Sequence, residues 1–273
     1  MKHPLRWLLV CLLSLLLAPS WIGALQSVPQ TRWPNAWERG AYQVRIPSTG
    51  KILWDVRWET FVNEGKTGTR VEIQEDGHGT PWRCKEPLVW KKKMVFHTDP
   101  TLQFQSVEES RWTEKGKLLN QTELRVSPDR RSIFCADREM GKPPELAVVP
   151  WTAQILPDEL LFHWARTLPF GPVGNQPPVL TECLLLVSPN RQFRLCAQVQ
   201  GIETIKTPAG AFSCYRVALS PRLPGPLKAL APKMALWCAV EPPHFWVRYQ
   251  GPVGGPGSPQ ATIELVEFQQ GSE

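Results

Sequence analysis

Histidine and cysteine are the side chains of this sequence best suited to nucleophilic, acid–base or metal chemistry. The chain has five histidines and seven cysteines. No Cys-x-x-Cys or Cys/His spacing matches a zinc or redox motif, and there is no Gly-x-Ser-x-Gly, His-Glu-x-x-His or phosphate-cradling glycine loop. A catalytic histidine needs a nucleophile and an orienting acid beside it, and no spacing here indicates one. The sequence therefore predicts neither an enzyme nor a metal or cofactor site.

Six cysteines beyond the first apolar stretch are disulfide candidates: Cys84, Cys135, Cys183, Cys196, Cys214 and Cys238. A hairpin around 188–191 with a two- or four-residue loop places Cys183 directly opposite Cys196, at a separation that suits a disulfide. A three-residue loop shifts the register and removes this pairing. Cys214 and Cys238 face each other if their strands pair, and Cys84 with Cys135 follows by elimination. The alternative is that some of the six are free and act as small buried apolar side chains.

The elements that would position these side chains are short strands separated by turns. Between Trp54 and Val62 apolar and polar residues alternate with the period of a half-buried strand. Turn-forming residues recur along the chain at a spacing that favours antiparallel sheet over strand–helix–strand units. Strands are predicted at 54–62, 69–74, 89–97, 102–112, 118–126, 132–136, 180–187, 192–199, 203–206, 212–219, 235–240, 245–249 and 261–268.

One mid-chain segment, 158–168, has helical periodicity instead. It places Leu160, Leu161, Trp164 and Leu168 along one stripe. Asp158 is the expected N-cap, and Pro169 ends the helix. The predicted fold class is therefore mainly β: a strongly curved antiparallel sheet, or incomplete β-barrel, with one short helix at about 158–168.

The first residues have the layout of a secretory signal peptide. A basic start precedes an apolar run from Leu8 to Ala18, and small or turn-forming residues follow. The run is too short to cross a membrane as a helix, although retention as a short anchor is the alternative. We predict a signal peptide at 1–24 and a single β-rich domain at 25–273. The protein is then periplasmic or extracellular, with membrane contact that is at most peripheral.

The charge of the chain is mildly basic, with a formal net value of +6. The longest basic run is Lys91-Lys92-Lys93, which predicts a solvated loop or strand edge, with an anionic partner as the alternative. No basic stripe alternates with aromatic residues that could stack on bases, so nucleic acid is not expected as a partner.

Residues 199–268 carry a pattern that resembles a known family. The stretch reads VQGIETIKTPAGAFSCYRVALSP, then MALWCAVEPPHFWVRYQGPVGG, then ATIELVEF. It resembles the exported bacterial family called domain of unknown function 3108, whose members carry a hairpin with the pattern G-x-E-T-V-x-T-P-A-G-x-F-x-C-Y-x-V and a later strand centred on tryptophan. The matching positions are Gly201, Glu203, Thr204, Pro208, Ala209, Gly210, Phe212, Tyr215, Val217 and Trp237.

The resemblance extends over about residues 155–268 and is weak before them. It implies a strongly curved antiparallel sheet with the helix against its concave face. Pro208 and Gly210 have the turn chemistry of a tight hairpin, so the motif is a structural signature rather than an active site. The family has no established activity that could be carried over to this chain.

Three classes of function are compared with these features. An incomplete barrel lined by tryptophan predicts a binding module for a lipid or other apolar ligand, with Trp164, Trp237 and Trp246 lining the site and Arg248 as polar anchor. Trp246 and Arg248 are expected on one strand face. The alternative is an envelope scaffold or assembly protein that binds another protein. A hydrolytic enzyme is a third reading. An open apolar cleft would favour ligand binding, and a packed interior would favour the scaffold.

Overall fold

The computed structural model describes residues 37–65, 68–82, 84–98, 101–171, 180–223, 231–253 and 258–271. The predicted signal peptide at 1–24 lies outside them. The first half of the described chain contains β1 (Glu38–Arg45), β2 (Ile52–Gly65), β3 (Gly68–Gly79), β4 (Leu88–His97), β5 (Gln103–Thr113), β6 (Leu118–Val126), β7 (Ser132–Glu139) and β8 (Glu145–Pro150). The second half contains β9 (Ile155–Pro157), the 3₁₀ turn η1 (Asp158–Leu160), helix α2 (Leu161–Ala165), β10 (Leu180–Ser188), β11 (Arg191–Thr207), β12 (Gly210–Pro221), β13 (Met234–Ala239), β14 (Trp246–Pro252) and β15 (Gln260–Gln270).

These fifteen strands form one sheet. Its order is β8-β7-β6-β5-β4-β3-β2-β1-β15-β14-β13-β12-β11-β10-β9. Neighbouring strands are antiparallel, apart from the parallel pair of β9 and β10. Because β1 pairs with β15, the two ends of the described chain meet in the middle of the sheet. Strands β8 and β9 follow each other in sequence but are the two outer edges of the sheet.

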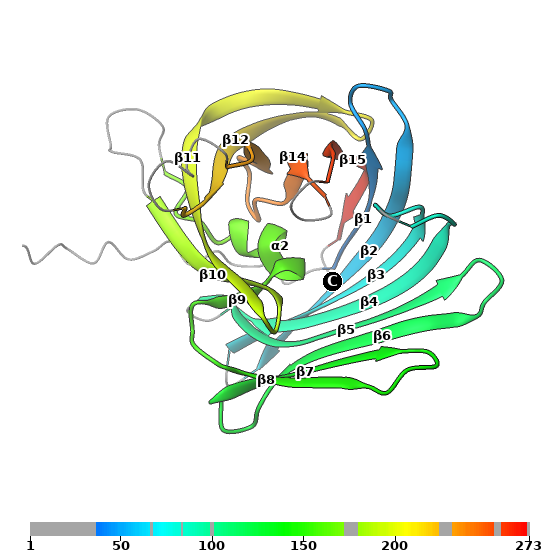
Figure 1. Cartoon of the computed structure of the whole chain (residues 1–273). Helices are drawn as coiled ribbons and strands as arrows, with labels where there is room; N and C mark the ends of the chain where they lie inside the picture. The colour runs from blue at the N-terminus through cyan, green and yellow to red at the C-terminus, as the bar shows by residue number, and fades with distance from the viewer. Residues whose placement is uncertain are drawn as a thin grey trace, which may run out of the picture.

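The sheet is strongly curled, and α2 lies inside the curl (Figure 1). Phe162 of α2 packs on Trp246 and Tyr249 of β14, with ring centroids 4.5 Å and 5.2 Å apart. On the other side, the ring of His163 is 6.1 Å from that of Phe96 in β4. The helix thus joins the two halves of the sheet from within. The predicted fold class, a mainly β curved open sheet with one short mid-chain helix, is confirmed.

The helix is shorter than predicted and begins differently. The segment starts as the 3₁₀ turn η1, and α2 ends at Ala165 rather than at Leu168. Asp158 makes no side-chain capping hydrogen bond, so its prediction as N-cap was wrong. Leu160 and Leu168 of the predicted stripe are buried, as expected for positions that face a core. Packing inside the curl therefore stabilises this short element.

Most predicted strands are present, with three differences. β1, β8 and β9 were not predicted. The predicted strands 192–199 and 203–206 are one continuous strand, β11, in which a register shift between Val199 and Gly201 replaces the expected break. Lysines 91–93 lie in the central strand β4 and not in a loop or at an edge, so that prediction was wrong.

A buried ion pair ties the curl to the helix segment. Arg166 donates two hydrogen bonds to the carboxylate of Glu38 in β1, at 2.9 Å and 2.8 Å. The side chains are 2% and 0% exposed. Arg166 Nε also donates to the carbonyl oxygen of Pro243 at 3.1 Å. A charge this deeply buried is stable only when paired and hydrogen-bonded, so the pair fixes the position of α2 against β1.

Candidate functional site

Of the four residues predicted to bind an apolar ligand, Trp237 and Arg248 lie directly opposite each other on β13 and β14, whereas Trp246 packs against β1 and α2. Trp246 is buried and stacks on Tyr42 of β1, with ring centroids 3.5 Å apart. Trp237 is also buried, but its indole nitrogen donates to Glu203 at 2.5 Å. Trp164 is half-buried on α2. These tryptophans contact protein side chains of the core, so they serve the packing of the chain.

The predicted shared face of Trp246 and Arg248 is also absent. Arg248 makes an ion pair with Glu264 at 2.7 Å and donates to the carbonyl oxygen of Lys206 at 2.6 Å. Phe162 of α2 contacts both Trp246 and Tyr249, the residue after Arg248, so Arg248 points to the other face of β14. The register of β13 and β14 shifts between Trp237 and Cys238, which interrupts the two-residue alternation of β14. A bulge of this kind leaves no trace in the apolar pattern of the sequence.

Other tryptophans cover glycines in neighbouring strands. Gly77 of β3 lies directly opposite Trp90 of β4, and a Cβ at Gly77 would be 2.0 Å from the indole ring. Gly40 of β1 lies opposite Trp58 of β2 in the same way, with 3.0 Å to the ring. The rings thus occupy the space that side chains would fill at these glycines. This packing explains part of the high tryptophan content without a ligand.

A row of charges crosses the sheet next to this apolar core. Glu75, Lys92 and Glu109 lie directly opposite one another on β3, β4 and β5. Lys92 Nζ is 3.3 Å from Glu109 and 3.8 Å from Glu75. Burial lowers the pKa of Lys92, but the two carboxylates outweigh burial and raise it. Burial raises the pKa of Glu109, and Lys92 and Arg111 bring it below its ordinary value. An acyl chain bound at this part of the sheet would have to remove water from these charged side chains, which is unfavourable.

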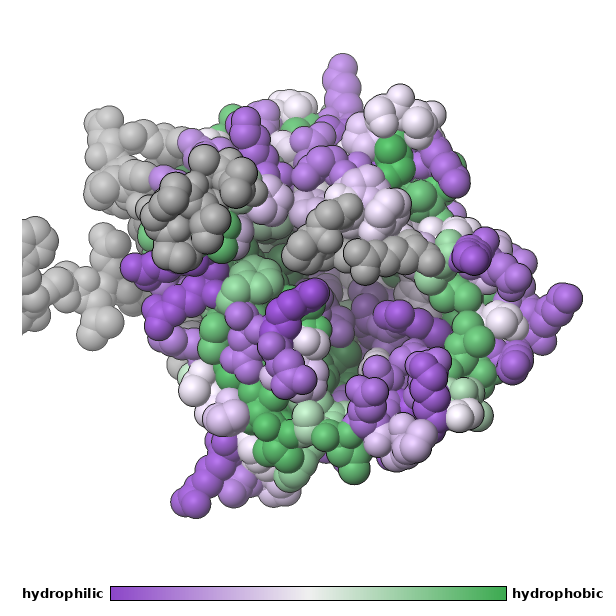
Figure 2. Space-filling model, viewed as in Figure 1, coloured by the Kyte–Doolittle hydropathy of each residue, from purple (hydrophilic) through white to green (hydrophobic). Residues whose placement is uncertain are grey.

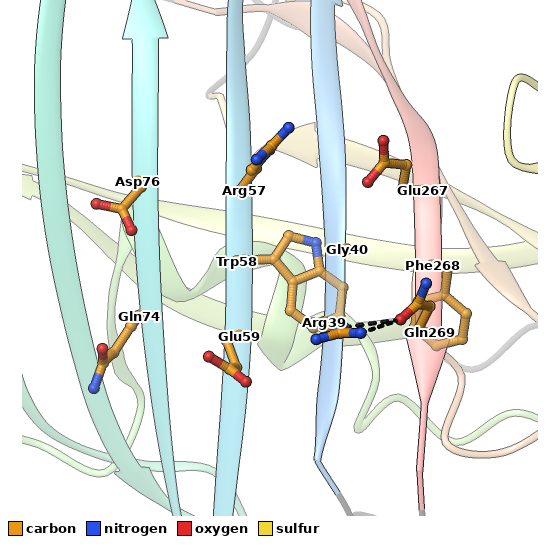
Figure 3. Close-up of a pocket in the computed structure, with 10 residues that line it drawn as sticks. All are labelled: Arg39, Gly40, Arg57, Trp58, Glu59, Gln74, Asp76, Glu267, Phe268 and Gln269. Atoms are coloured by element: carbon orange, nitrogen blue, oxygen red, sulfur yellow. Dashed lines mark hydrogen bonds between the residues drawn. The ribbon is translucent and has the colours of Figure 1, made fainter.

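The middle of the sheet carries a polar hollow of about 400 Å³ on β15, β1, β2 and β3 (Figure 3). Arg39 spans two of these strands and donates to Gln269 at 2.8 Å and 2.6 Å. The remaining lining residues are Gly40, Arg57, Trp58, Glu59, Gln74, Asp76, Glu267 and Phe268. Charges of both signs and amides dominate this lining, so the hollow does not fit the apolar ligand predicted from the sequence.

The six cysteines that the structure describes are all present as thiols, and no disulfide joins them. The predicted register of β10 and β11 was wrong by one residue, because Cys183 lies opposite Leu195 and Cys196 opposite Glu182. A register shift between Leu186 and Ser188 near the turn causes the displacement. Cys214 lies opposite Ala239, and Cys238 opposite Tyr215. Residues that differ by one position point to opposite faces of a strand, so neither predicted pair faces across its ladder.

The described histidines occupy unrelated environments. Burial, reinforced by Arg166 and Lys92, lowers the pKa of His163 to about 3. His78 Nε2 is 2.8 Å from Glu114 on the exposed surface, and His244 Nδ1 is 3.0 Å from the carbonyl oxygen of Ala239. In the described ranges no three His, Cys, Asp or Glu side chains group as metal ligands. Nor does any helix there have the length and apolar character needed to cross a membrane.

Three large apolar side chains are exposed at one free edge of the sheet, the edge formed by β8. Phe134 of β7 lies opposite Val148 of β8, and Leu146 lies next to them on the same face. Their side chains are 50%, 62% and 73% exposed. We call these three residues the β8 row. Figure 2 shows apolar side chains gathered at the lower corner of the molecule, where Figure 1 places β7 and β8.

The backbone of β8 is open on one side. The amide of Trp151 donates to the carbonyl oxygen of Arg131 at 2.9 Å, in register with the β7–β8 ladder. Hydrogen-bonding direction alternates along an antiparallel strand, so the polar groups of Ala147 and Val149 face β7. Those of Leu146 and Val148 face away from β7. In the described part of the chain, β7 is the only sheet neighbour of β8.

Sequence reasoning missed this edge entirely. Between 136 and 158 it predicted no element, although Leu146 to Val149 is an apolar run bounded by Pro144 and Pro150. That run was the available signal. Its length of four residues is typical of a strand, but flanking prolines also favour loops. Whether a strand is an edge depends on the order of the whole sheet, which no local pattern encodes.

Comparison with known proteins assigns the chain to no family. No protein-family model and no curated protein matches the chain. A crystal structure described as a putative lipoprotein from Parabacteroides distasonis shares 11% identity, with 87% of this chain and 97% of that chain covered and a TM-score of 0.36. One described as a putative exported protein with YmcC-like fold from Bacteroides fragilis shares 14% identity, covers 87% and 96%, and has a TM-score of 0.31. At these TM-scores the likeness carries no argument.

Proposed function

We propose that this chain is an exported, non-catalytic protein of the cell envelope that binds another polypeptide along the free edge of β8. The observation that carries the proposal is the β8 row, three large apolar side chains beside an open strand backbone. Export is supported by the signal-peptide pattern at residues 1–24. Such an edge matches the recognition mode in which an extended segment adds a strand to a sheet.

The other edge strand of the sheet, β9, lacks the exposed apolar side chains of β8. β9 has three residues, all of them buried, and it ends at Pro157. Short and covered edges are among the devices by which proteins prevent unwanted strand pairing, whereas the terminal proline is common to both edges. β8 has six residues and exposes Leu146 and Val148 beside its free amides. An apolar edge of this kind favours association, because pairing removes both the side chains and the polar backbone from water.

Binding of a lipid receives less support than docking of a polypeptide. The predicted ligand contacts Trp237 and Trp246 are buried against protein partners. The row of Glu75, Lys92 and Glu109 places charge beside the apolar core. Docking requires neither a vacant interior nor a cofactor.

The proposal is tested by site-specific photo-crosslinking in living cells. A photoreactive residue is placed at Phe134, on the β8 row, and in a matched chain at Ile52, which is equally exposed but lies at the start of β2. We expect one discrete adduct from position 134, identified by mass spectrometry, and none from position 52. Val148→Pro, which removes one edge-facing amide, should abolish the adduct. The absence of an adduct at 134, or its survival in Val148→Pro, contradicts the proposal.

A further inference from the structure

We propose that the strand bound by β8 is the β8 of a second copy of this chain, paired antiparallel about Ala147 in a symmetric dimer. This inference rests on the proposed function and names the partner for the same edge. Closed two-fold association is the commonest form of protein self-assembly, and it requires a surface complementary to itself. The backbone, the side chains and the charges of β8 each meet that requirement.

The free edge of β8 presents two amide donors and their two carbonyl acceptors, which a second copy of the same strand can pair. Leu146 and Val148 direct their amide and carbonyl groups away from β7, as the Trp151 to Arg131 hydrogen bond fixes by alternation. In a register centred on Ala147, Leu146 of one copy lies opposite Val148 of the other, and the reverse. Both edge donors of each copy then meet a carbonyl oxygen. Pro144 and Pro150 lie opposite each other at the next positions and lack donors, so no unpaired amide remains there.

The side chains agree with this register. Leu146 and Val148 share the exposed face of β8, so their cross-strand pairing continues the β8 row of one copy into that of the other. At the centre, the two Ala147 side chains meet at a non-hydrogen-bonded pair, where side chains approach most closely and small residues fit. A register centred on Val148 would use the same donors, but it would place Leu146 against Pro150.

The charges at the two ends of β8 select the antiparallel direction. Glu145 is exposed at the start of the strand and lies opposite Asp137 of β7, whereas Glu139 at the end of β7 is paired with Lys142. At the other end lie Arg130 and Arg131, in the turn before β7; both are exposed and outnumber the one acid of that turn, Asp129, which is 4.0 Å from Arg131. Antiparallel pairing brings the acidic end of each copy to the basic end of the other. Parallel pairing would place Glu145 beside Glu145, which is unfavourable.

The test is the mass of the mature protein in solution as a function of concentration, measured by analytical ultracentrifugation. We expect a monomer–dimer equilibrium in the wild type. Val148→Pro and, separately, Leu146→Lys should weaken the dimer at least about tenfold. Two variants are used because proline at 148 can perturb β8 itself, whereas lysine at an exposed position leaves the fold intact. Ile52→Lys, at an exposed apolar site outside the edge, should leave the dimer unchanged.

Hydrogen–deuterium exchange tests the register. The amides of Leu146 and Val148 should gain protection as protein concentration rises, whereas those of Ala147 and Val149 should be protected at every concentration. A monomer at all concentrations up to about 100 µM overturns the inference, as does a dimer that persists in Val148→Pro and Leu146→Lys. If the protein is monomeric but position 134 still crosslinks to a different protein, docking at β8 stands and only self-association fails. If neither occurs, both fail.

Discussion

At the scale of single residues, Lys92 is the cation that holds two carboxylates on the sheet. Its neighbours Lys91 and Lys93 lie on the opposite face of β4 and are exposed. Replacing Lys92 by methionine leaves Glu109, which is 6% exposed, beside Glu75 with the central cation removed. We expect Lys92→Met to lower the free energy of unfolding by about 2–3 kcal/mol, as measured by urea denaturation.

Lys91→Met is the matched control. Lys91 pairs with Asp76 at 3.4 Å, but both side chains are mostly exposed to water. Exposed ion pairs contribute little, so this variant should stay within about 0.5 kcal/mol of the wild type. Equal losses in the two variants would show that the position of Lys92 in the row is unimportant.

His163 makes stability depend on pH in a defined direction. Burial, with Arg166 and Lys92 nearby, lowers its pKa to about 3, whereas in the unfolded chain it titrates near its ordinary value. The unfolded state therefore takes up a proton below about pH 6.5 while the native state does not. The stability contributed by the neutral ring is complete above that pH, and it is lost as the pH falls toward 3.

The measurement is the difference in unfolding free energy between wild type and His163→Gln, which cancels the titration of other groups. Between pH 6.5 and pH 5, the wild type should lose about 1.5 kcal/mol more unfolding free energy than His163→Gln loses. This expected change does not depend on the difference between the two proteins at neutral pH. A difference independent of pH over this range would mean that His163 is protonated in the native protein or titrates equally in both states.

At the scale of elements, paired strands are shaped by tryptophan rings that lie over glycines. A methyl group at Gly77 would overlap the ring of Trp90, which is buried and has little room to move. We expect Gly77→Ala to destabilise the protein by about 1–3 kcal/mol in thermal or urea unfolding. Gly201→Ala is the control, because a methyl group at Gly201 would have no other atom within 4 Å and the backbone there is not left-handed. That variant should be neutral or slightly stabilising.

Strand patterns predict elements well where one face is apolar, as in β2 and β4. They fail where the determinant is another strand. β1 was missed because its buried face includes Glu38, whose partner Arg166 lies far away in sequence. The pairing of Cys183 with Cys196 failed on a single register shift near the turn. Trp246 and Arg248 do not share the predicted face, because Val247 is an extra residue of β14 between the pairs Trp237–Arg248 and Cys238–Trp246. The β8 edge was beyond prediction because edges are defined by sheet order.

At the scale of the whole molecule, the two halves of the open sheet are joined by the pairing of β1 with β15. These strands are far apart in sequence, yet the carbonyl oxygen of Trp37 accepts a hydrogen bond from the amide of Gly271 at 3.1 Å. By contrast, β8 and β9 are joined by the short link 151–154 but lie at opposite ends of the sheet order. Thr152, Ala153 and Gln154 of this link are exposed. The strand pairing with the largest separation in sequence is therefore the one between the first and last described strands, β1 and β15.

This arrangement predicts that a circular permutant will fold faster than the natural order. The permutant begins at Ala153, continues to Gly271, passes through a short glycine–serine linker to Trp37, and ends at Thr152. The β15–β1 pairing then becomes a local hairpin, while no strand pairing is cut, because β8 and β9 are not partners. Lower contact order lowers the entropy lost before pairing, so stopped-flow refolding should accelerate severalfold. The unfolding free energy should change by no more than about 2 kcal/mol, since the cut disturbs hydrogen bonds only near the link.

A permutant opened between Lys91 and Lys92, inside β4, keeps the same new hairpin but breaks a central strand, and it should not fold. If the first permutant refolds no faster than the natural chain, the β1–β15 pairing is not what limits folding, and strand formation within each half would have to be slower than their union.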